Sequence, residues 1–513
     1  MDLLLTIDKK NFRMKEKALI GIMLVSGLTY VLFCLTVKAT FWWDSIAYLE
    51  LSEYMKSLVL WRDYHHSEYR FLFQHIGYGL SGLIRLIELI QGNDSLITLI
   101  IFQNILNWLS VCFLAYAIFE KYKSLSISIV TIVLCSFSSF YLMFNNAYMT
   151  ESINASLLNF GLGIIIRSKF NDLKPYVILS LIIFLSFQFR ISTPIILMCF
   201  LMAKLINSSF SKSSFLTFSI IFCLGYALMP VFRYVTTDKF YFPNHHSIQP
   251  RLALLYNPNP SKQLVRDLEN YFKNDVSLLK IREFGYPDFA ILANNMSING
   301  MNDSQVRENF SKLVKSIKYD NWNTISNSML IATTSLGFTH HELIQKKQRE
   351  ITFNQTAERF SNHVRNHYKW LQWRSGNYTN TFEIFLTRFN KDRKLYLESS
   401  INKFKNNLKG RIVDQRSLSQ IWFIDYLPPF LFTSLAIIFA VFGLFRSHYR
   451  EISISILLTL TSYLFISFLA SAGNPRYFHG IYIVAVLGTS FFCSLSFRKI
   501  FYRTKKLVSF AHN

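Results

Sequence analysis

Residues 41–54 read FWWDSIAYLELSEY and come just after the first long apolar run of the chain. Trp42 and Trp43 are residue types that favour the headgroup zone of a bilayer, so the run is predicted to end at a membrane surface. Asp44 follows, and a carboxylate in this position can take a proton from a hydroxyl or hold a cation. It can equally cap the amphipathic, interfacial helix predicted for residues 45–60. Both roles stay open from this stretch alone.

The composition is that of a membrane protein. Hydrophobic residues make up 51% of the 513 residues, and several apolar runs are long enough to cross a bilayer. The net charge of +23 is explained in part by Lys and Arg in loops on one side of the membrane, so no nucleic-acid partner is expected. The rest of the charge lies in residues 236–418, which could face acidic membrane lipids or phosphate-bearing substrates, or could form an ordinary solvated surface. The six cysteines all fall in apolar runs and predict neither a disulfide framework nor a zinc site.

The basic residues orient the chain. Lys9 and Arg13 precede the first apolar run and place the N-terminus in the cytoplasm. The apolar run at residues 71–90 contains Arg85 and Glu88, which are costly at mid-bilayer, so we interpret it as a second interfacial or re-entrant helix. Ten spans with both ends inside then place nearly every basic short loop in the cytoplasm. They are predicted at residues 18–37, 95–119, 126–144, 153–166, 176–189, 194–206, 215–235, 427–445, 452–470 and 480–497.

The predicted fold class is therefore an all-α polytopic membrane protein with three parts. Residues 1–235 form a transmembrane module with a catalytic outer loop, and residues 419–513 hold the last transmembrane helices. Residues 236–418 form a mostly helical extracytoplasmic domain, because a polar region of this length is too long for a loop without structure. Since this region contains no cysteine, a bacterial inner (plasma) membrane is the expected location.

The orientation, which Lys and Arg alone determine, gathers unusual charged residues on the outer face. Asp44 follows span one, Glu151 in the sequence AYMTES precedes span four, Arg190 ends span five, and Arg476 lies in the loop before the last span. Two carboxylates and two arginines on one face suit a lipid phosphate, since arginine pairs with phosphate and a carboxylate acts as base on a hydroxyl. Helix capping, snorkelling and ordinary loop charges are the alternatives.

The order of these motifs resembles the GT-C fold of integral-membrane glycosyltransferases, which use polyprenyl-phosphate sugars and include protein O-mannosyltransferases and aminoarabinose transferases. The resemblance covers residues 18–235: a span, an outer D-S-x-x-Y motif, a second interfacial helix, and T-E before the fourth span. The sequence NPRYFHG at residues 474–480 is similar to an R-Y motif of the last outer loop. Where many members carry R-P-P-G-Y-P, this chain has QHIGYG at residues 74–79.

The resemblance implies roles for particular residues. Asp44 would be the base that removes the acceptor's proton, and Glu151 would assist it or bind the acceptor. The candidates for binding the donor phosphate are basic residues near the outer face, namely Arg70, Arg85, Arg190 and Arg476. The candidates for further substrate contacts are Tyr48, Tyr78 and Tyr477. A divalent metal held by the two carboxylates stays open as a cofactor, although no ligand spacing demands one.

Three functions remain open at this point. The first is transfer of a sugar from a polyprenyl-phosphate donor to a lipid, glycan or protein acceptor on the extracytoplasmic face. The second is a transporter or flippase for a lipid-linked saccharide, against which the chain shows no related halves. The third is an oligosaccharide polymerase or ligase that uses a pyrophosphate-linked donor. The motifs around Asp44 and Glu151 favour the first.

Overall fold

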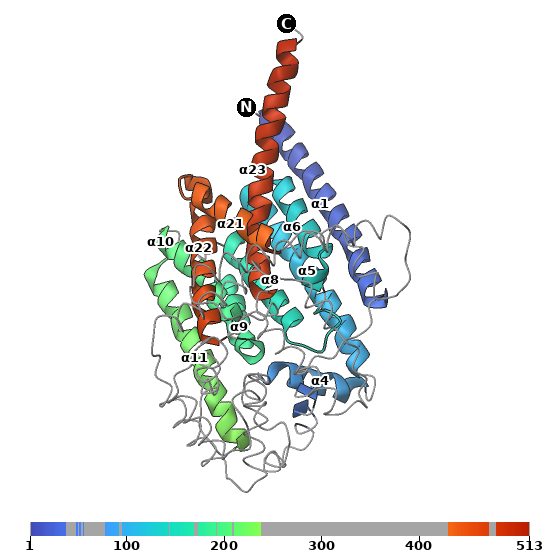
Figure 1. Cartoon of the computed structure of the whole chain (residues 1–513), viewed down its shortest axis with the longest axis vertical. Helices are drawn as coiled ribbons and strands as arrows, with labels where there is room; N and C mark the ends of the chain where they lie inside the picture. Colours follow the sequence, from blue (N-terminus) through green and yellow to red (C-terminus); the bar gives the residue numbers. More distant parts are fainter. Residues whose placement is uncertain are drawn as a thin grey trace, which may run out of the picture.

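The described part of the chain is a bundle of helices (Figure 1). The computed structural model describes residues 2–36, 48–49, 51–52, 55, 77–91, 95–142, 144–168, 173–190, 192–207, 210–237, 429–470 and 479–511, and it contains no β-strand within these ranges. The helices are α1 (Asp2–Thr36), α4 (Gly79–Gln91), α5 (Ser95–Tyr122), α6 (Leu125–Ser136), α7 (Ser139–Leu142), α8 (Glu151–Arg167), α9 (Leu173–Phe189), α10 (Ser192–Ile206), α11 (Lys212–Thr237), α21 (Pro429–Gly443), α22 (Ser447–Ala470) and α23 (His479–Ala511). The predicted all-α class is thus confirmed for these residues.

Helix α8 is the central element, because it packs against α5, α9, α10 and α23 and is buried along nearly its whole length. Two glycines let its neighbours approach closely. A Cβ at Gly161 would come within 2.6 Å of Leu197 on α10, and a Cβ at Gly163 would come within 2.6 Å of Phe113 on α5. Small residues at such crossings are typical of helices that pack in a membrane.

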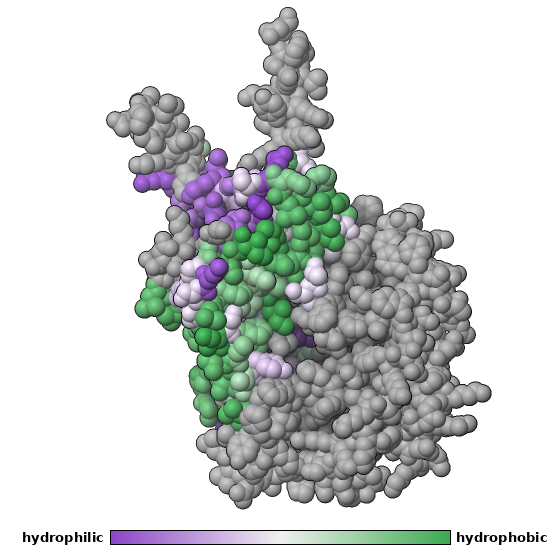
Figure 2. Space-filling view, turned by 90° about the vertical axis from the view of Figure 1, so that its left-hand side faces the viewer, coloured by the Kyte–Doolittle hydropathy of each residue, from purple (hydrophilic) through white to green (hydrophobic). Residues whose placement is uncertain are grey.

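The apolar surface of the bundle supports the prediction that the chain is a membrane protein. Arg13–Leu35 in α1 and Ile97–Tyr122 in α5 are long and apolar enough to cross a bilayer, and several shorter apolar helices accompany them. Figure 2 shows hydrophobic residues over most of the coloured surface on one side, with hydrophilic residues gathered toward the end where both termini lie (Figure 1). Large hydrophobic side chains are exposed on several helices, among them Leu28, Leu181, Leu216, Ile220, Leu224 and Phe442.

The helices depart from the predicted spans in several places. The third predicted span, residues 126–144, is divided into α6 and the short α7. Between them the Ser138 hydroxyl accepts hydrogen bonds from Tyr482 Oη (3.0 Å) and from the backbone N–H of Tyr141 (3.3 Å), and such side-chain bonding competes with a continuous helix. Helix α8 starts at Glu151, two residues before the predicted span, so this carboxylate belongs to the helix and not to the preceding loop.

Helix α4 lies at the end of the bundle away from the two termini (Figure 1). Its 13 residues give a length of about 20 Å, which is shorter than the hydrocarbon core of about 30 Å. Of the extracytoplasmic domain predicted at residues 236–418, residues 238–418 lie outside the described part of the chain.

Candidate functional site

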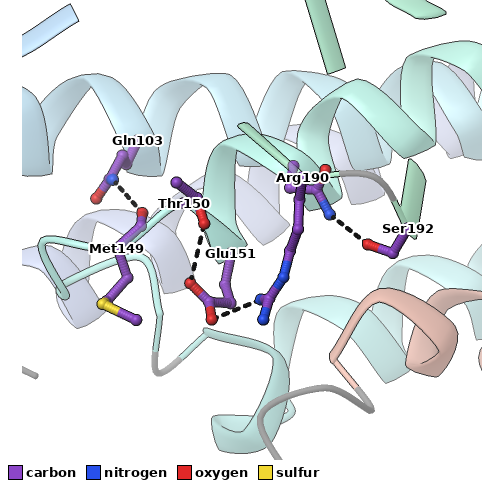
Figure 3. Close-up of polar contacts among 7 residues, drawn as sticks. Gln103, Met149, Thr150, Glu151, Arg190 and Ser192 are labelled. Atoms are coloured by element: carbon purple, nitrogen blue, oxygen red, sulfur yellow. Dashed lines mark hydrogen bonds and ion pairs between the residues drawn. The ribbon is translucent and has the colours of Figure 1, made fainter. Parts of the chain in front are cut away.

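Glu151 and Arg190 form an ion pair where two helix ends meet (Figure 3). Arg190 Nη1 donates to Glu151 Oε1 at 2.6 Å. The Glu151 side chain is only 1% exposed, and the Arg190 side chain is 17% exposed. A carboxylate with so little contact with water needs a charged partner, because desolvation would otherwise disfavour its ionised form.

The positions of the two residues on their helices explain why opposite charges meet here. Glu151 is the first residue of α8, and Arg190 follows the last residue of α9, where its backbone N–H donates to the Ser186 carbonyl at 2.7 Å. The helix macrodipole favours an anion at an N-terminus and a cation at a C-terminus. The Thr150 hydroxyl adds a long contact of 3.4 Å to Glu151 Oε2. Local helix electrostatics therefore stabilise both charges.

The start of α10 is joined to the same corner. Asn154 Nδ2, in the first turn of α8, donates to Ser192 Oγ at 3.3 Å. Thr193 Oγ1 donates back to the Asn154 carbonyl at 3.2 Å. Helices α8, α9 and α10 therefore converge on the ion pair.

The loop at residues 144–150 leads into Glu151 and is held by hydrogen bonds from side chains of α5 and α8. Gln103 Nε2 on α5 donates to the Met149 carbonyl at 3.2 Å (Figure 3), and Ser152 Oγ donates to Asn145 Oδ1 at 2.7 Å. Burial raises the pKa of Tyr148 in this loop to about 12. Its phenol is protonated at neutral pH, as it would be at its ordinary pKa, and can donate a hydrogen bond.

Residues 77–79, which lead into α4 and begin it, pack directly against the end of α9, next to Arg190. A Cβ at Gly79 would come within 2.8 Å of the Gln188 carbonyl oxygen, and a Cβ at Gly77 would collide with the same atom. Ser81 Oγ on α4 donates to the Tyr48 carbonyl at 2.9 Å. Glycine at positions 77 and 79 therefore permits the close backbone approach of this segment to α9.

The structure brings some of the predicted site residues together and leaves others apart. It joins Glu151 to Arg190, whereas Arg85 pairs with Glu88 on the same helix at 3.3 Å. Tyr48 is buried in the hydrophobic core, and Tyr78 is partly buried against it. The remaining candidates lie outside the described residues: Asp44, Arg70, Arg476 and Tyr477.

Sequence reasoning missed a buried set of polar side chains that connects the helices next to this corner. Asn107 on α5 accepts from Tyr30 of α1 at 3.0 Å and donates to Tyr141, while Asn159 on α8 donates to Tyr141 at 2.8 Å and to Ser110 at 3.0 Å. The available signal was the presence of amides inside apolar runs, since polar groups there are costly and are retained where they find partners.

A second group of charges lies at the other end of α8. Arg167 Nε is 2.6 Å from Glu120 Oε2, and the two side chains are partly exposed, at 47% and 34%. Nearby, the buried Lys204 Nζ donates to the Ser168 carbonyl at 3.2 Å and lies 3.5 Å from Glu451. These contacts join α5, α8, α10 and α22, and they supply controls for the pair at the opposite end.

Within the described ranges, no group of three or more His, Cys, Asp or Glu side chains is close enough together to hold a metal ion.

The chain matches no protein-family model, and comparisons with curated proteins and with solved structures give no significant match. The residues of the site themselves are therefore the basis for its chemistry.

Proposed function

We propose that the chain is an integral-membrane glycosyltransferase with about ten transmembrane helices and cytoplasmic termini. It would transfer a sugar from a polyprenyl-phosphate donor to an acceptor at the extracytoplasmic face. The observation that carries the proposal is the ion pair between Glu151 and Arg190 at the meeting point of α8, α9 and α10. Its composition matches the layout of the GT-C resemblance, in which an acidic residue and a basic residue serve the acceptor and the donor phosphate.

The ion pair is a chemically suitable place for a lipid phosphate. The guanidinium group of Arg190 can bind two phosphate oxygens at once, and its partial exposure leaves an approach for a ligand. A buried ion pair is weak evidence for stability, because an apolar pair of similar volume is often as stable. Charged groups placed in such surroundings are more typical of functional sites.

The proposed reaction is a displacement at the anomeric carbon. The acceptor hydroxyl oxygen forms the new glycosidic bond, and its proton passes to Asp44 as general base. The bond between the anomeric carbon and the phosphate oxygen breaks, and its electron pair leaves with the polyprenyl phosphate. Arg190 stabilises the negative charge on that phosphate, while Glu151 orients Arg190. The configuration at the anomeric carbon is inverted.

A flippase for a lipid-linked saccharide is the second candidate function. The observation in its favour is the set of buried amides in the middle of α5 and α8, Asn107 and Asn159, since transporters carry polar groups near mid-bilayer. Both amides are engaged with Tyr141 and with neighbouring helices, which gives them a structural role in the bundle.

The experiment that separates these functions uses purified protein in vesicles with undecaprenyl phosphate that carries a radiolabelled hexose as the probe. The proposal predicts cleavage of the sugar–phosphate bond in the presence of a membrane extract as acceptor. Movement of the intact lipid-linked sugar across the bilayer without cleavage would identify a flippase. Consumption of a diphosphate-linked saccharide, with the monophosphate-linked donor left intact, would identify a polymerase or ligase.

A further inference from the structure

We infer that Asn146 is a positioning residue for Glu151, acting as a bridge between the end of α1 and the loop that leads into α8. The inference rests on the proposed function only for what Glu151 does in the reaction. The bridge itself is a set of hydrogen bonds among buried groups. Asn146 Nδ2 donates to the Phe33 carbonyl of α1 at 3.2 Å, and Asn104 Nδ2 of α5 donates to Asn146 Oδ1 at 2.8 Å.

The Phe33 carbonyl needs a partner from outside its helix. Helix α1 ends at Thr36, and the last four carbonyls of an α-helix have no partner within it. Phe33 is one of these four and is buried, so water is a poor substitute. Asn146 thus caps α1 from a distant part of the chain and fixes the end of that helix relative to the loop.

The second bond explains why an amide is suited to position 146. A carboxamide carries a donor and an acceptor on one planar group, so Asn146 can serve α1 and α5 at the same time. Asn104, which also donates to the Asn145 carbonyl at 3.5 Å, is itself buried. Asn104, Asn146 and Phe33 are therefore joined by hydrogen bonds that run from α5 through the loop to α1, and we call this set the relay.

The relay lies five residues before Glu151, and the loop between them is fixed at two further points. Gln103 holds the Met149 carbonyl, and Ser152 holds Asn145. A loop fixed in this way delivers the first residue of α8 in one position. Removing the Asn146 bridge is expected to let the loop move, which separates Glu151 from Arg190 for part of the time.

The test measures the accessibility of the Glu151 carboxyl directly and needs no donor lipid. Purified protein in detergent is treated with dicyclohexylcarbodiimide, an apolar reagent for carboxyl groups, and labelling of each carboxyl is followed by mass spectrometry. Asn146→Ala and Asn104→Ala are each expected to raise the labelling rate of Glu151 about tenfold, because each removes hydrogen bonds between buried groups. Glu120, whose side chain is 34% exposed, serves as the internal reference and keeps its rate.

Asn159→Ala is the matched control, because it also removes a buried amide with two side-chain hydrogen bonds from the same bundle. Its labelling of Glu151 is expected to stay at the wild-type rate. The inference is overturned if Glu151 labelling is unchanged in both relay variants, or if Asn159→Ala raises it equally. Because this result does not depend on sugar transfer, an inactive protein would refute the proposed function and leave the labelling result standing.

Where transfer is measurable, a double variant separates positioning from general destabilisation. Asn146→Ala is expected to lower kcat in the wild-type background and to have no further effect in a Glu151→Gln background, since it acts through Glu151. A further loss of the same size in the Glu151→Gln background would contradict the positioning role.

Discussion

Glu151 and Arg190 are 39 residues apart in the chain, yet their side chains meet at 2.6 Å. The contact joins the N-terminus of α8 to the C-terminus of α9, so each charge lies where its own helix dipole favours it. Glu151 is buried and Arg190 retains some exposure, so the pair links the two helices and leaves part of the guanidinium group in contact with solvent.

The first prediction concerns the stability of this pair. Glu151→Ala should lower the free energy of unfolding by about 3–5 kcal/mol, because it leaves a largely buried guanidinium group without this carboxylate. The measurement is thermal unfolding of purified protein in detergent. Glu120→Ala removes the carboxylate of an equally short pair that is more exposed than Glu151–Arg190, and it should cost about 1 kcal/mol or less.

Equal losses in Glu151→Ala and Glu120→Ala would contradict this interpretation. The two pairs have the same 2.6 Å separation, so the difference between the variants reports burial and not distance.

Sequence reasoning anticipated the partners in this pair but not their contact. The distribution of Lys and Arg placed Glu151 and Arg190 on the same predicted face, since the ends of successive spans alternate between the two sides of a membrane. It gave no distance between them and no burial, because both depend on how α8, α9 and α10 pack. The same limit applies to Arg85, whose carboxylate partner in the described structure is Glu88 on its own helix.

The second prediction concerns the close approach of residues 77–79, at the start of α4, to the end of α9. Gly79→Ala should destabilise the protein by about 1–3 kcal/mol, because the new methyl group would press on the Gln188 carbonyl oxygen. Gly82→Ala is the control, since a Cβ at Gly82 meets nothing within 4 Å. That variant should be stabilised by up to about 1 kcal/mol through its higher helix propensity. Thermal unfolding of both variants checks the difference, and a stable Gly79→Ala protein would show that the backbones do not pack so closely.

The third prediction concerns Lys204, which is buried near the C-terminus of α10. Lys204→Met should lower the free energy of unfolding by about 3 kcal/mol or more, because Glu451 loses its cation and Ser168 loses a donor. The double variant Lys204→Met/Glu451→Leu should recover most of that loss, because no buried charge is then left without its partner. Chemical or thermal unfolding measures both. A double variant that is less stable than the single variant would show that the ion pair itself provides the stability.

The buried relay and some of the helix boundaries could not be predicted from the sequence. Asn104 and Asn146 gave no periodic signal, because their importance comes from a bond to the end of α1, more than one hundred positions away for Asn146. The break between α6 and α7 was hidden in a continuous apolar run, since hydropathy does not register the Ser138 hydrogen bonds that interrupt the helix. The apolar runs themselves predicted helices, and the described residues bear this out.

The fourth prediction concerns the proposed base. Asp44→Asn should lower the rate of sugar transfer by about a hundredfold or more, because an amide cannot accept the proton of the acceptor hydroxyl. The variant should bind undecaprenyl phosphate as the wild type does. Vesicle-based transfer of a radiolabelled hexose provides the rate, and transfer at the wild-type rate would exclude Asp44 as the base.

The most direct measurement is thermal stabilisation of the purified protein by undecaprenyl phosphate, compared among the wild type, Arg190→Ala and Arg167→Ala. A ligand present at one hundred times its Kd should stabilise the folded wild type by about 2.7 kcal/mol. Arg167→Ala removes an arginine from an equally short ion pair at the other end of α8 and should keep this stabilisation, whereas Arg190→Ala should lose it. Equal stabilisation of Arg190→Ala and the wild type would contradict the assignment of the lipid phosphate to the Glu151–Arg190 site.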